Sequence, residues 1–222
     1  MLVLFDIDGT LLHGRPEGHT RAMVDAMARV WAVPVEPDDV WRIDPPGRTD
    51  REIARLVLRA HGVGDGDIDA GMAEWMLIAA RLHDEVAGDH PAPVAAADAA
   101  HVTAALRDGG TEIALLTGNL EPIGRAKVAA AGLDGRFGPG GGFGSDAEAR
   151  ADLVGVARSR AAGNYRDDEV VIVGDTPRDI AAARAAGVRV VAVTTGAFGP
   201  DVLAGADGVA DDLTGALGIL TA

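Results

Sequence analysis

Short apolar runs recur along the chain, and Val, Ile and Leu fill them without the polar alternation of a half-exposed strand. Such runs are typical of strands that helices cover on both faces, as in a parallel sheet. One run lies at the start of the sequence, and the others lie in its second half. The predicted strands are Leu2–Phe5, Glu112–Leu116, Val170–Val173, Val188–Val193 and the weaker Gly208–Ala210.

Stretches with helical spacing of apolar residues separate the later strands. Pro lies near the start of two of these stretches and Gly follows each of them, which is the usual asymmetry of helix ends. Strands and helices in alternation indicate a doubly wound α/β fold with a parallel sheet. The helices predicted here are Leu120–Ala131, Glu148–Ala162 and Pro177–Ala186.

The interval between the first two strands breaks this rhythm, because its periodicity is helical throughout. Thr49 followed by Glu52 forms a capping-box signature within it. We therefore expect a helical unit at residues 15–91, inserted into a core made of residues 1–14 and 92–222. Its predicted helices are His19–Trp31, Arg51–Ala60 and Met72–Val86, and a further helix, Val94–Arg107, follows two prolines at the return to the core.

Acidic residues outnumber basic ones, 34 to 20, which gives a formal net charge of −14. Such a surface repels phosphate backbones and anionic lipid, so we expect neither a nucleic-acid partner nor a membrane partner. A phosphorylated substrate would need local positive charge from a metal or a few placed bases. The chain has no Cys, which excludes disulfides, cysteine-ligated zinc and thiol catalysis.

No apolar run approaches ~18 residues, the length that spans a membrane, and no charged leader precedes the first strand. A soluble, cytoplasmic protein is the expectation. The sequence leaves the oligomeric state open, and a monomer is compatible with it.

The motif Asp6-Ile7-Asp8-Gly9-Thr10 directly follows the first predicted strand. Ligands of open α/β sheets bind at the carboxyl ends of the strands, so this motif places two carboxylates at such an end. Close carboxylates repel, and either a cation or a shared proton must stabilise them. A hard divalent cation such as Mg²⁺ prefers oxygen ligands and fits this pair.

Two other strand ends carry matching chemistry. Thr117, Gly118 and Asn119 follow the second strand and offer a hydroxyl and amides to a phosphate, with helix capping as the alternative for Asn119. Asp175 follows the third predicted strand of the sheet and is expected to face the first two carboxylates. Asp179 stands three residues after Thr176, so it could cap the next helix, support the metal site, or do both.

These motifs, DIDGT, the Thr117 strand end and GDTPRD, resemble motifs I, II and IV of the haloacid dehalogenase-like hydrolases. The resemblance extends over nearly the whole chain and implies a Rossmann-like core with an inserted helical C1 cap, as in phosphoglycolate phosphatase and β-phosphoglucomutase relatives. It also implies phosphoryl transfer, because family members that attack carbon have another residue in place of Asp8.

The resemblance assigns a role to each matching residue. Asp6 would take the phosphoryl group as an aspartyl-phosphate, and Asp8 would protonate the leaving oxygen and then deprotonate the attacking water. Mg²⁺ would bind the Asp6 carboxylate, the Asp8 backbone carbonyl and Asp175. Thr117 would hold a phosphoryl oxygen, with Gly118 and Asn119 nearby.

The third motif of the family usually offers a Lys upstream of motif IV, and this sequence departs from that pattern. The single Lys of the chain, Lys127, comes too early and is expected on a solvated helix face. Arg150 stands at the position where the family also tolerates Arg, and it could bind phosphoryl and carboxylate groups. A surface position is the alternative, and Arg158 and Arg160 are weaker candidates.

The segment Pro45-Pro46-Gly47-Arg48-Thr49-Asp50 is the best candidate for a substrate-facing cap loop, with a plain interhelical turn as the alternative. Arg48 adds positive charge for phosphate binding there. The leading hypothesis is a Mg²⁺-dependent phosphatase acting on a small phosphorylated metabolite. The alternatives are a sugar-phosphate mutase of the same fold and, from another class, a catalytically silent binding protein.

Overall fold

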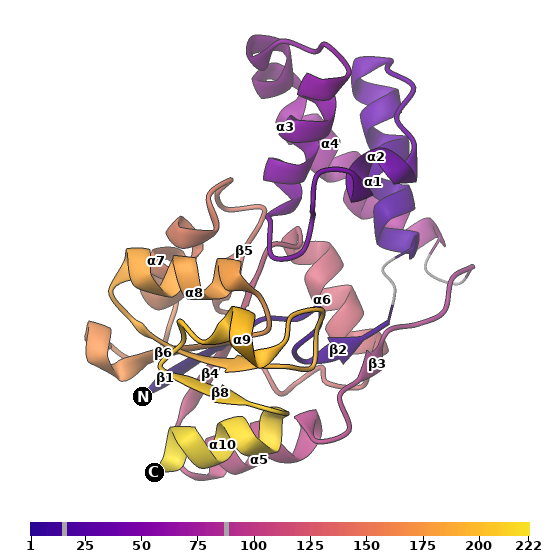
Figure 1. The fold of residues 1–222 in the computed structure, drawn as a ribbon. Helices are drawn as coiled ribbons and strands as arrows, with labels where there is room; N and C mark the ends of the chain where they lie inside the picture. Colours follow the sequence, from indigo (N-terminus) through magenta and orange to yellow (C-terminus); the bar gives the residue numbers. More distant parts are fainter. Residues whose placement is uncertain (15–16, 87–88) are drawn as a thin grey trace.

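Six strands form a parallel sheet at the centre of the computed structural model, which describes residues 1–14, 17–86 and 89–222 (Figure 1). The strand order is β5-β4-β1-β6-β7-β8, so the first strand lies in the middle of the sheet. The predicted doubly wound α/β fold and its strands are thereby confirmed. The strands are β1 (Leu2–Phe5), β4 (Glu112–Thr117), β5 (Gly141–Phe143), β6 (Val170–Gly174), β7 (Arg189–Val193) and β8 (Gly208–Ala210).

Helices cover both faces of the sheet, which explains why β1 shows no polar alternation (Figure 1). Val3 and Phe5 pack with α5 and α10 on one face. Leu2 and Leu4 pack with α7 and α8 on the other face. The helices of this part are α5 (Ala99–Asp108), α6 (Glu121–Ala130), α7 (Arg150–Ser159), α8 (Pro177–Ala186), α9 (Pro200–Leu203) and α10 (Leu213–Thr221), with a 3-10 turn η1 at Asp167–Glu169.

The helices between β2 (Leu12–His13) and β3 (Val94–Ala95) gather around a separate hydrophobic cluster that includes Met27, Leu58 and Trp75 (Figure 1, indigo to magenta). Leu120 and Ile123 belong to the same cluster, so α6 links it to the sheet. We call the four helices of this layer the cap helices: α1 (Glu17–Trp31), α2 (Pro37–Trp41), α3 (Asp50–Ala60) and α4 (Asp65–Val86).

The division into a core (1–14 and 92–222) and a cap domain (15–91) stays a prediction, and its first boundary falls at residues 15–16, outside the described residues. A short antiparallel ladder of β2 (Leu12–His13) and β3 (Val94–Ala95) joins the chain where it leaves the sheet to the chain where it returns. No helix in the described ranges has both the length and the apolar character that a membrane crossing requires.

Two predicted helices are wrong at their starts. The helix predicted over Val94–Arg107 begins at Ala99, because Val94 and Ala95 pair with β2 instead. Ala-rich sequence has high helix propensity, but tertiary pairing overrides it here. The helix predicted from Met72 begins earlier, at Asp65, because its first turn tolerates Gly66 and carries acids that suit a helix N-terminus.

Candidate active site

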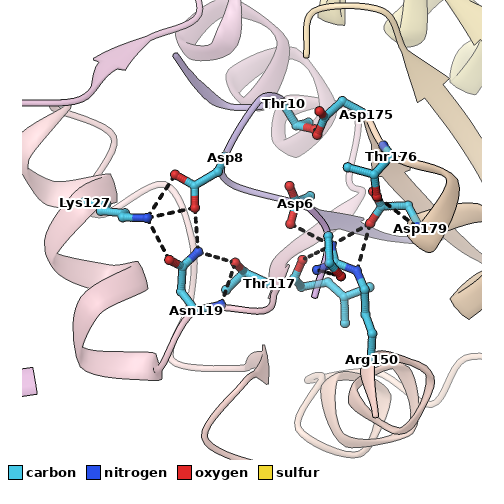
Figure 2. Close-up of polar contacts among 12 residues, drawn as sticks. Asp6, Asp8, Thr10, Thr117, Asn119, Lys127, Arg150, Asp175, Thr176 and Asp179 are labelled. Carbon is cyan, nitrogen blue, oxygen red and sulfur yellow. Dashed lines mark hydrogen bonds and ion pairs between the residues drawn. The ribbon is translucent and has the colours of Figure 1, made fainter. Parts of the chain in front are cut away.

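Three neighbouring strands, β4, β1 and β6, end at one edge of the sheet and bring their polar side chains together (Figure 2). They line a cavity of about 430 Å³ that the cap helices close from the other side. Every site residue predicted from the sequence lines this cavity except Asp179, which lies behind it. These lining residues are Asp6, Asp8, Arg48, Thr117, Gly118, Asn119, Arg150 and Asp175.

The loop after β1 turns sharply at Gly9, whose φ of +88° favours glycine. A Cβ at Gly9 would also lie 2.3 Å from the Asp175 carboxylate, and one at Gly196 would lie 1.7 Å from it. The main chain of two loops, one after β1 and one after β7, therefore lies close to the Asp175 carboxylate. Thr10 holds the same carboxylate by donating from Oγ1 to Oδ1 at 3.0 Å. These contacts fix the Asp175 side chain beside the DIDGT loop.

Arg150 points into the site from the first turn of α7 and is almost fully buried (Figure 2). Its Nη2 donates to Oδ1 of Asp6 at 2.7 Å and to Oδ1 of Asp179 at 2.5 Å. The alternative of a surface position is therefore wrong. Arg158 and Arg160 pair with other acids, Asp167 and Asp146, and do not line the cavity.

Asp179 caps the next helix as predicted, and its support of a metal site stays a prediction. It closes a capping box with Thr176 at the start of α8, where Thr176 Oγ1 donates to Asp179 Oδ2 at 2.7 Å. Its other oxygen accepts from Arg150, so the helix cap also holds the guanidinium that contacts Asp6.

Burial dominates the electrostatics of two carboxyl groups in the site. It raises the pKa of Asp6, which Arg150 opposes and Asp179 reinforces. It also raises the pKa of Asp175, and the neighbouring carboxylates of Asp6 and Asp179 add to the rise. Both carboxylates would be stabilised in their ionised form by a bound cation.

The donors suit Mg²⁺, which prefers oxygen ligands, keeps several waters and needs few carboxylates. The Asp6 and Asp175 carboxylates lie at this edge. Gly9 and Gly196 lie so close to Asp175 that a Cβ at either position would occupy the space around its carboxylate. Among the described residues, no cluster of three or more His, Cys, Asp or Glu side chains is arranged around a metal position. A site with two carboxylates and a backbone carbonyl is consistent with that observation.

Lys127 is buried, not solvated, so the prediction for its position is wrong. Its Nζ donates to both carboxylate oxygens of Asp8, at 3.0 and 2.8 Å (Figure 2). The helix that carries it packs close to the site because Gly124 has no side chain, and a Cβ there would lie 3.2 Å from Ile7. One signal in the sequence was available: Lys127 is four residues after the apolar Ile123, hence on the same helix face.

Asn119 does not cap the helix after β4, since Leu120 stands at the N-cap without a side-chain bond. Its Nδ2 donates to Asp8 Oδ2 at 2.8 Å and to Thr117 Oγ1 at 2.6 Å. The Thr117 hydroxyl also accepts from the Asn119 main chain at 3.2 Å. With its oxygen used as an acceptor, the hydroxyl keeps its proton for a ligand oxygen.

The cap loop, residues 45–49, lies directly on the end of β4. A Cβ at Gly118 would lie 2.0 Å from the Arg48 carbonyl oxygen, and the Asp50 main-chain N–H donates to Gly118 O at 2.8 Å. The Thr49 half of the predicted capping box is confirmed, because Thr49 Oγ1 accepts from Glu52 N at 3.1 Å, whereas the Glu52 side chain pairs with Arg48. The charge of the Arg48 guanidinium is already paired with Glu52, and its Nε donates to the loop carbonyls of Ile43 and Asp44.

Several residues around the cavity were not anticipated from the sequence. Thr195 follows β7 at the same sheet edge and donates to Gly9 O at 2.6 Å, a place that the strand-end rule indicates. Trp41 and His19 come from the cap helices, and no local motif marks them. Trp41 is 49% exposed and adds an apolar side chain to the lining of the cavity.

Comparison with known proteins agrees with this site. A family model of haloacid dehalogenase-like hydrolases matches residues 1–187. A phosphoglycolate phosphatase from Rhodospirillum rubrum is 31% identical over 201 residues, which are 87% of this chain and 79% of that protein.

Two solved structures show the same fold. A hydrolase from Pseudomonas syringae superposes with a TM-score of 0.70 at 19% identity, over 99% of this chain and 97% of that one. CbbY from Rhodobacter sphaeroides in complex with phosphate superposes with a TM-score of 0.65 at 19% identity, over 96% and 94%. Together with the family model and the curated relative, the site assigns the chain to the haloacid dehalogenase-like hydrolases, in their phosphatase subfamily.

Proposed function

We propose that the chain hydrolyses a small organic phosphomonoester with Mg²⁺ through an aspartyl-phosphate on Asp6. The observation that carries the proposal is the meeting of Asp6, Asp8 and Asp175 at one sheet edge with the Arg150 guanidinium 2.7 Å from Asp6. Acids alone would repel a phosphate, and Arg150 supplies permanent positive charge beside the attacking carboxylate.

In the first half of the reaction, a carboxylate oxygen of Asp6 attacks phosphorus, and the bond from phosphorus to the organic oxygen breaks. Asp8 gives its proton to that leaving oxygen. In the second half, water attacks the phosphoryl group, Asp8 takes a proton from the water, and the bond to Asp6 breaks to release inorganic phosphate. Splitting the displacement into two steps in this way lowers the barrier of each.

Other side chains bind and orient the phosphoryl group. The free proton of the Thr117 hydroxyl and the Arg150 guanidinium can each meet a phosphoryl oxygen, and both are held by neighbours before substrate arrives. Such preorganised donors stabilise charge in the transition state. The Asp6 and Asp175 carboxylates and the Asp8 carbonyl would hold Mg²⁺, which would neutralise charge on the transferring group.

The choice between phosphatase and sugar-phosphate mutase depends on the cap. A mutase needs a basic cap site for a second phosphate. The Arg side chains that line the cavity in the described residues are already paired, Arg48 with Glu52 and Arg150 with Asp6 and Asp179. Because these Arg charges are already paired with carboxylates, the cavity favours hydrolysis over the mutase reaction, which needs a second phosphate site.

The experiment is a phosphate-release assay on a broad panel of monoesters, with phosphoglycolate included because of the Rhodospirillum rubrum relative. We expect release that needs Mg²⁺, disappears with EDTA, and is lost in Asp6→Asn and retained in the control Asp201→Asn, an exposed acid. A mutase would be activated by a sugar bisphosphate and release little phosphate. No turnover of any monoester by folded protein would favour the silent binding protein.

A further inference from the structure

A buried row of side chains runs from the cap helices to Asp8. Lys127 Nζ lies within hydrogen-bond distance of both Asp8 oxygens, at 3.0 and 2.8 Å, of Asn119 Oδ1 at 2.7 Å and of His19 Nδ1 at 3.1 Å. Its side chain is only 5% exposed. An ammonium group has three hydrogens, and four acceptor atoms already surround it. Lys127 therefore has no donor left for a phosphoryl oxygen and acts through Asp8 instead.

The direction of each hydrogen bond in the row follows from Lys127. An ammonium group only donates, so we assign His19 Nδ1 as the acceptor in this contact. With that assignment, Nε2 of His19 is the donor to Asp50 Oδ2, which lies 3.0 Å away. Asp50 is 2% exposed, and the same oxygen accepts from the Leu120 main chain at 2.7 Å. The row thus begins at a carboxylate that is fixed by the backbone.

The row crosses between the two layers of the molecule. Asp50 begins α3 and His19 lies on α1, both cap helices, whereas Lys127 lies on α6 beside the sheet. Asp8 itself is 44% exposed, and its side chain is held by Lys127 and Asn119 alone among the described side chains. A carboxylate that must both give and take a proton needs to stay within hydrogen-bond reach of the reacting oxygen.

We propose that Lys127 is a positioning residue for Asp8, and that His19 and Asp50 hold Lys127 so that the cap helices help to place the acid–base carboxylate. The proposal rests on the proposed function, since it assigns Asp8 to proton transfer. It deepens that function because proton transfer by Asp8 would then depend on how α1 and α3 pack against α6.

The test compares two substrates with Lys127→Met. An alkyl phosphate needs its leaving oxygen protonated, whereas 4-nitrophenyl phosphate leaves as a stable phenolate. We expect kcat/KM, which reports only the steps up to phosphoenzyme formation, to fall roughly 100-fold for the alkyl ester and only a few-fold for the aryl ester. Arg125→Met, on the same helix and outside the cavity, is the matched control and should change neither.

An equal loss on both substrates, or no loss on either, would overturn the proposal. If the wild type hydrolyses no monoester, the proposed function fails instead, so the two failures are distinguishable. Should Lys127→Met fold poorly, Lys127→Ala with added methylamine replaces it. The amine should restore alkyl-ester turnover if the lost ammonium positions Asp8, and lack of rescue in folded protein counts against the proposal.

A double-mutant cycle tests His19. Because His19 acts through Lys127, His19→Ala should lower alkyl-ester kcat/KM in the wild type and cause little further loss in Lys127→Met. Fully additive losses would show that His19 works by another route. Arg21→Ala, an exposed change on the same helix, is the control for perturbing α1.

Discussion

Arg150 Nη2 lies 2.7 Å from Asp6 Oδ1, and both side chains are 7% exposed. The same nitrogen contacts Asp179, so one guanidinium serves two buried carboxylates. Removal of the shared cation would leave two buried negative charges without their partner, which is far more costly than loss of an exposed ion pair. Arg150 is therefore expected to matter for folding as well as for activity.

Arg150→Met should lower the free energy of unfolding by about 3–5 kcal/mol and abolish phosphate release. Urea denaturation and the phosphate assay measure the two effects. Arg158→Met is the control, because Arg158 pairs with Asp167 at the surface and such pairs contribute at most ~1 kcal/mol. Equal stability of the two variants would contradict the importance of the Arg150 pairing.

Asp175→Asn should stabilise the metal-free protein. Burial and neighbouring carboxylates raise the pKa of Asp175, so the folded state holds a proton that the unfolded state gives up above the ordinary pKa of 3.8. Stability of the metal-free wild type is consequently lost as pH rises from that value through the raised pKa, and an amide removes this loss.

Calorimetry checks this prediction. Relief of about 1 kcal/mol shifts Tm by roughly 2–4 °C in a chain of this size. We expect the metal-free variant to melt above the wild type at neutral pH, and the rise in Tm that Mg²⁺ gives the wild type to be absent from the variant. A variant that melts below the wild type without metal, and still responds to Mg²⁺, would argue against Asp175 as a metal ligand.

The strand-end residues were predictable because their placement is local. Asp6, Thr117 and Asp175 each follow a buried apolar run directly, and adjacent parallel strands align such positions at one edge. Arg150 was placed by resemblance to a family motif, and no periodicity in the sequence points to its partner Asp6, which is far away along the chain.

Lys127, His19 and Asp50 could not be assembled from the sequence, because they belong to three helices whose packing is purely tertiary. A lone basic residue on a helix is normally solvated, but here the helix packs closely against the loop after β1 at Gly124, and Lys127 is buried. The prediction of a helix at Val94 and Ala95 was wrong for a related reason. These residues form β3, and their pairing partner β2 is distant along the chain.

His83 should make the fold sensitive to acid. Burial lowers the pKa of His83 to about 4 from 6.5, and the nearby Lys127 charge acts in the same direction. The neutral imidazole thus belongs to the folded state, and the unfolded state binds a proton first as pH falls. Stability is present above pH 6.5 and is lost as pH drops toward 4, by at most ~3 kcal/mol.

Chemical denaturation across that pH range measures the loss, with His83→Leu as the comparison. Leu cannot be protonated, so the variant should show a flatter stability profile between pH 6.5 and 4. His101→Leu, on the exposed face of α5, is the control and should leave the slope unchanged. Parallel profiles for the wild type and His83→Leu would show that another group titrates.

Gly118→Ala should separate the cap loop from the end of β4. The added Cβ would lie 2.0 Å from the Arg48 carbonyl oxygen and 3.0 Å from Thr49 Cα, which are main-chain atoms that cannot rotate away. The loop must shift, which strains the hydrogen bond from Asp50 N to Gly118 O and opens the cavity wall that Arg48 and Gly118 help to form. We expect KM for a phosphomonoester to rise several-fold and the free energy of unfolding to fall by ~1–3 kcal/mol.

Gly155→Ala is the matched control. Gly155 lies inside α7 with open space where its Cβ would be, so this substitution should raise stability by up to ~1 kcal/mol and leave KM unchanged. Steady-state kinetics and denaturation on the two variants separate the general effect of a methyl group from contact with the cap loop. If Gly118→Ala retains the wild-type KM, contact of the cap loop with β4 is not needed for substrate binding, because the three atoms nearest to the new Cβ belong to that loop.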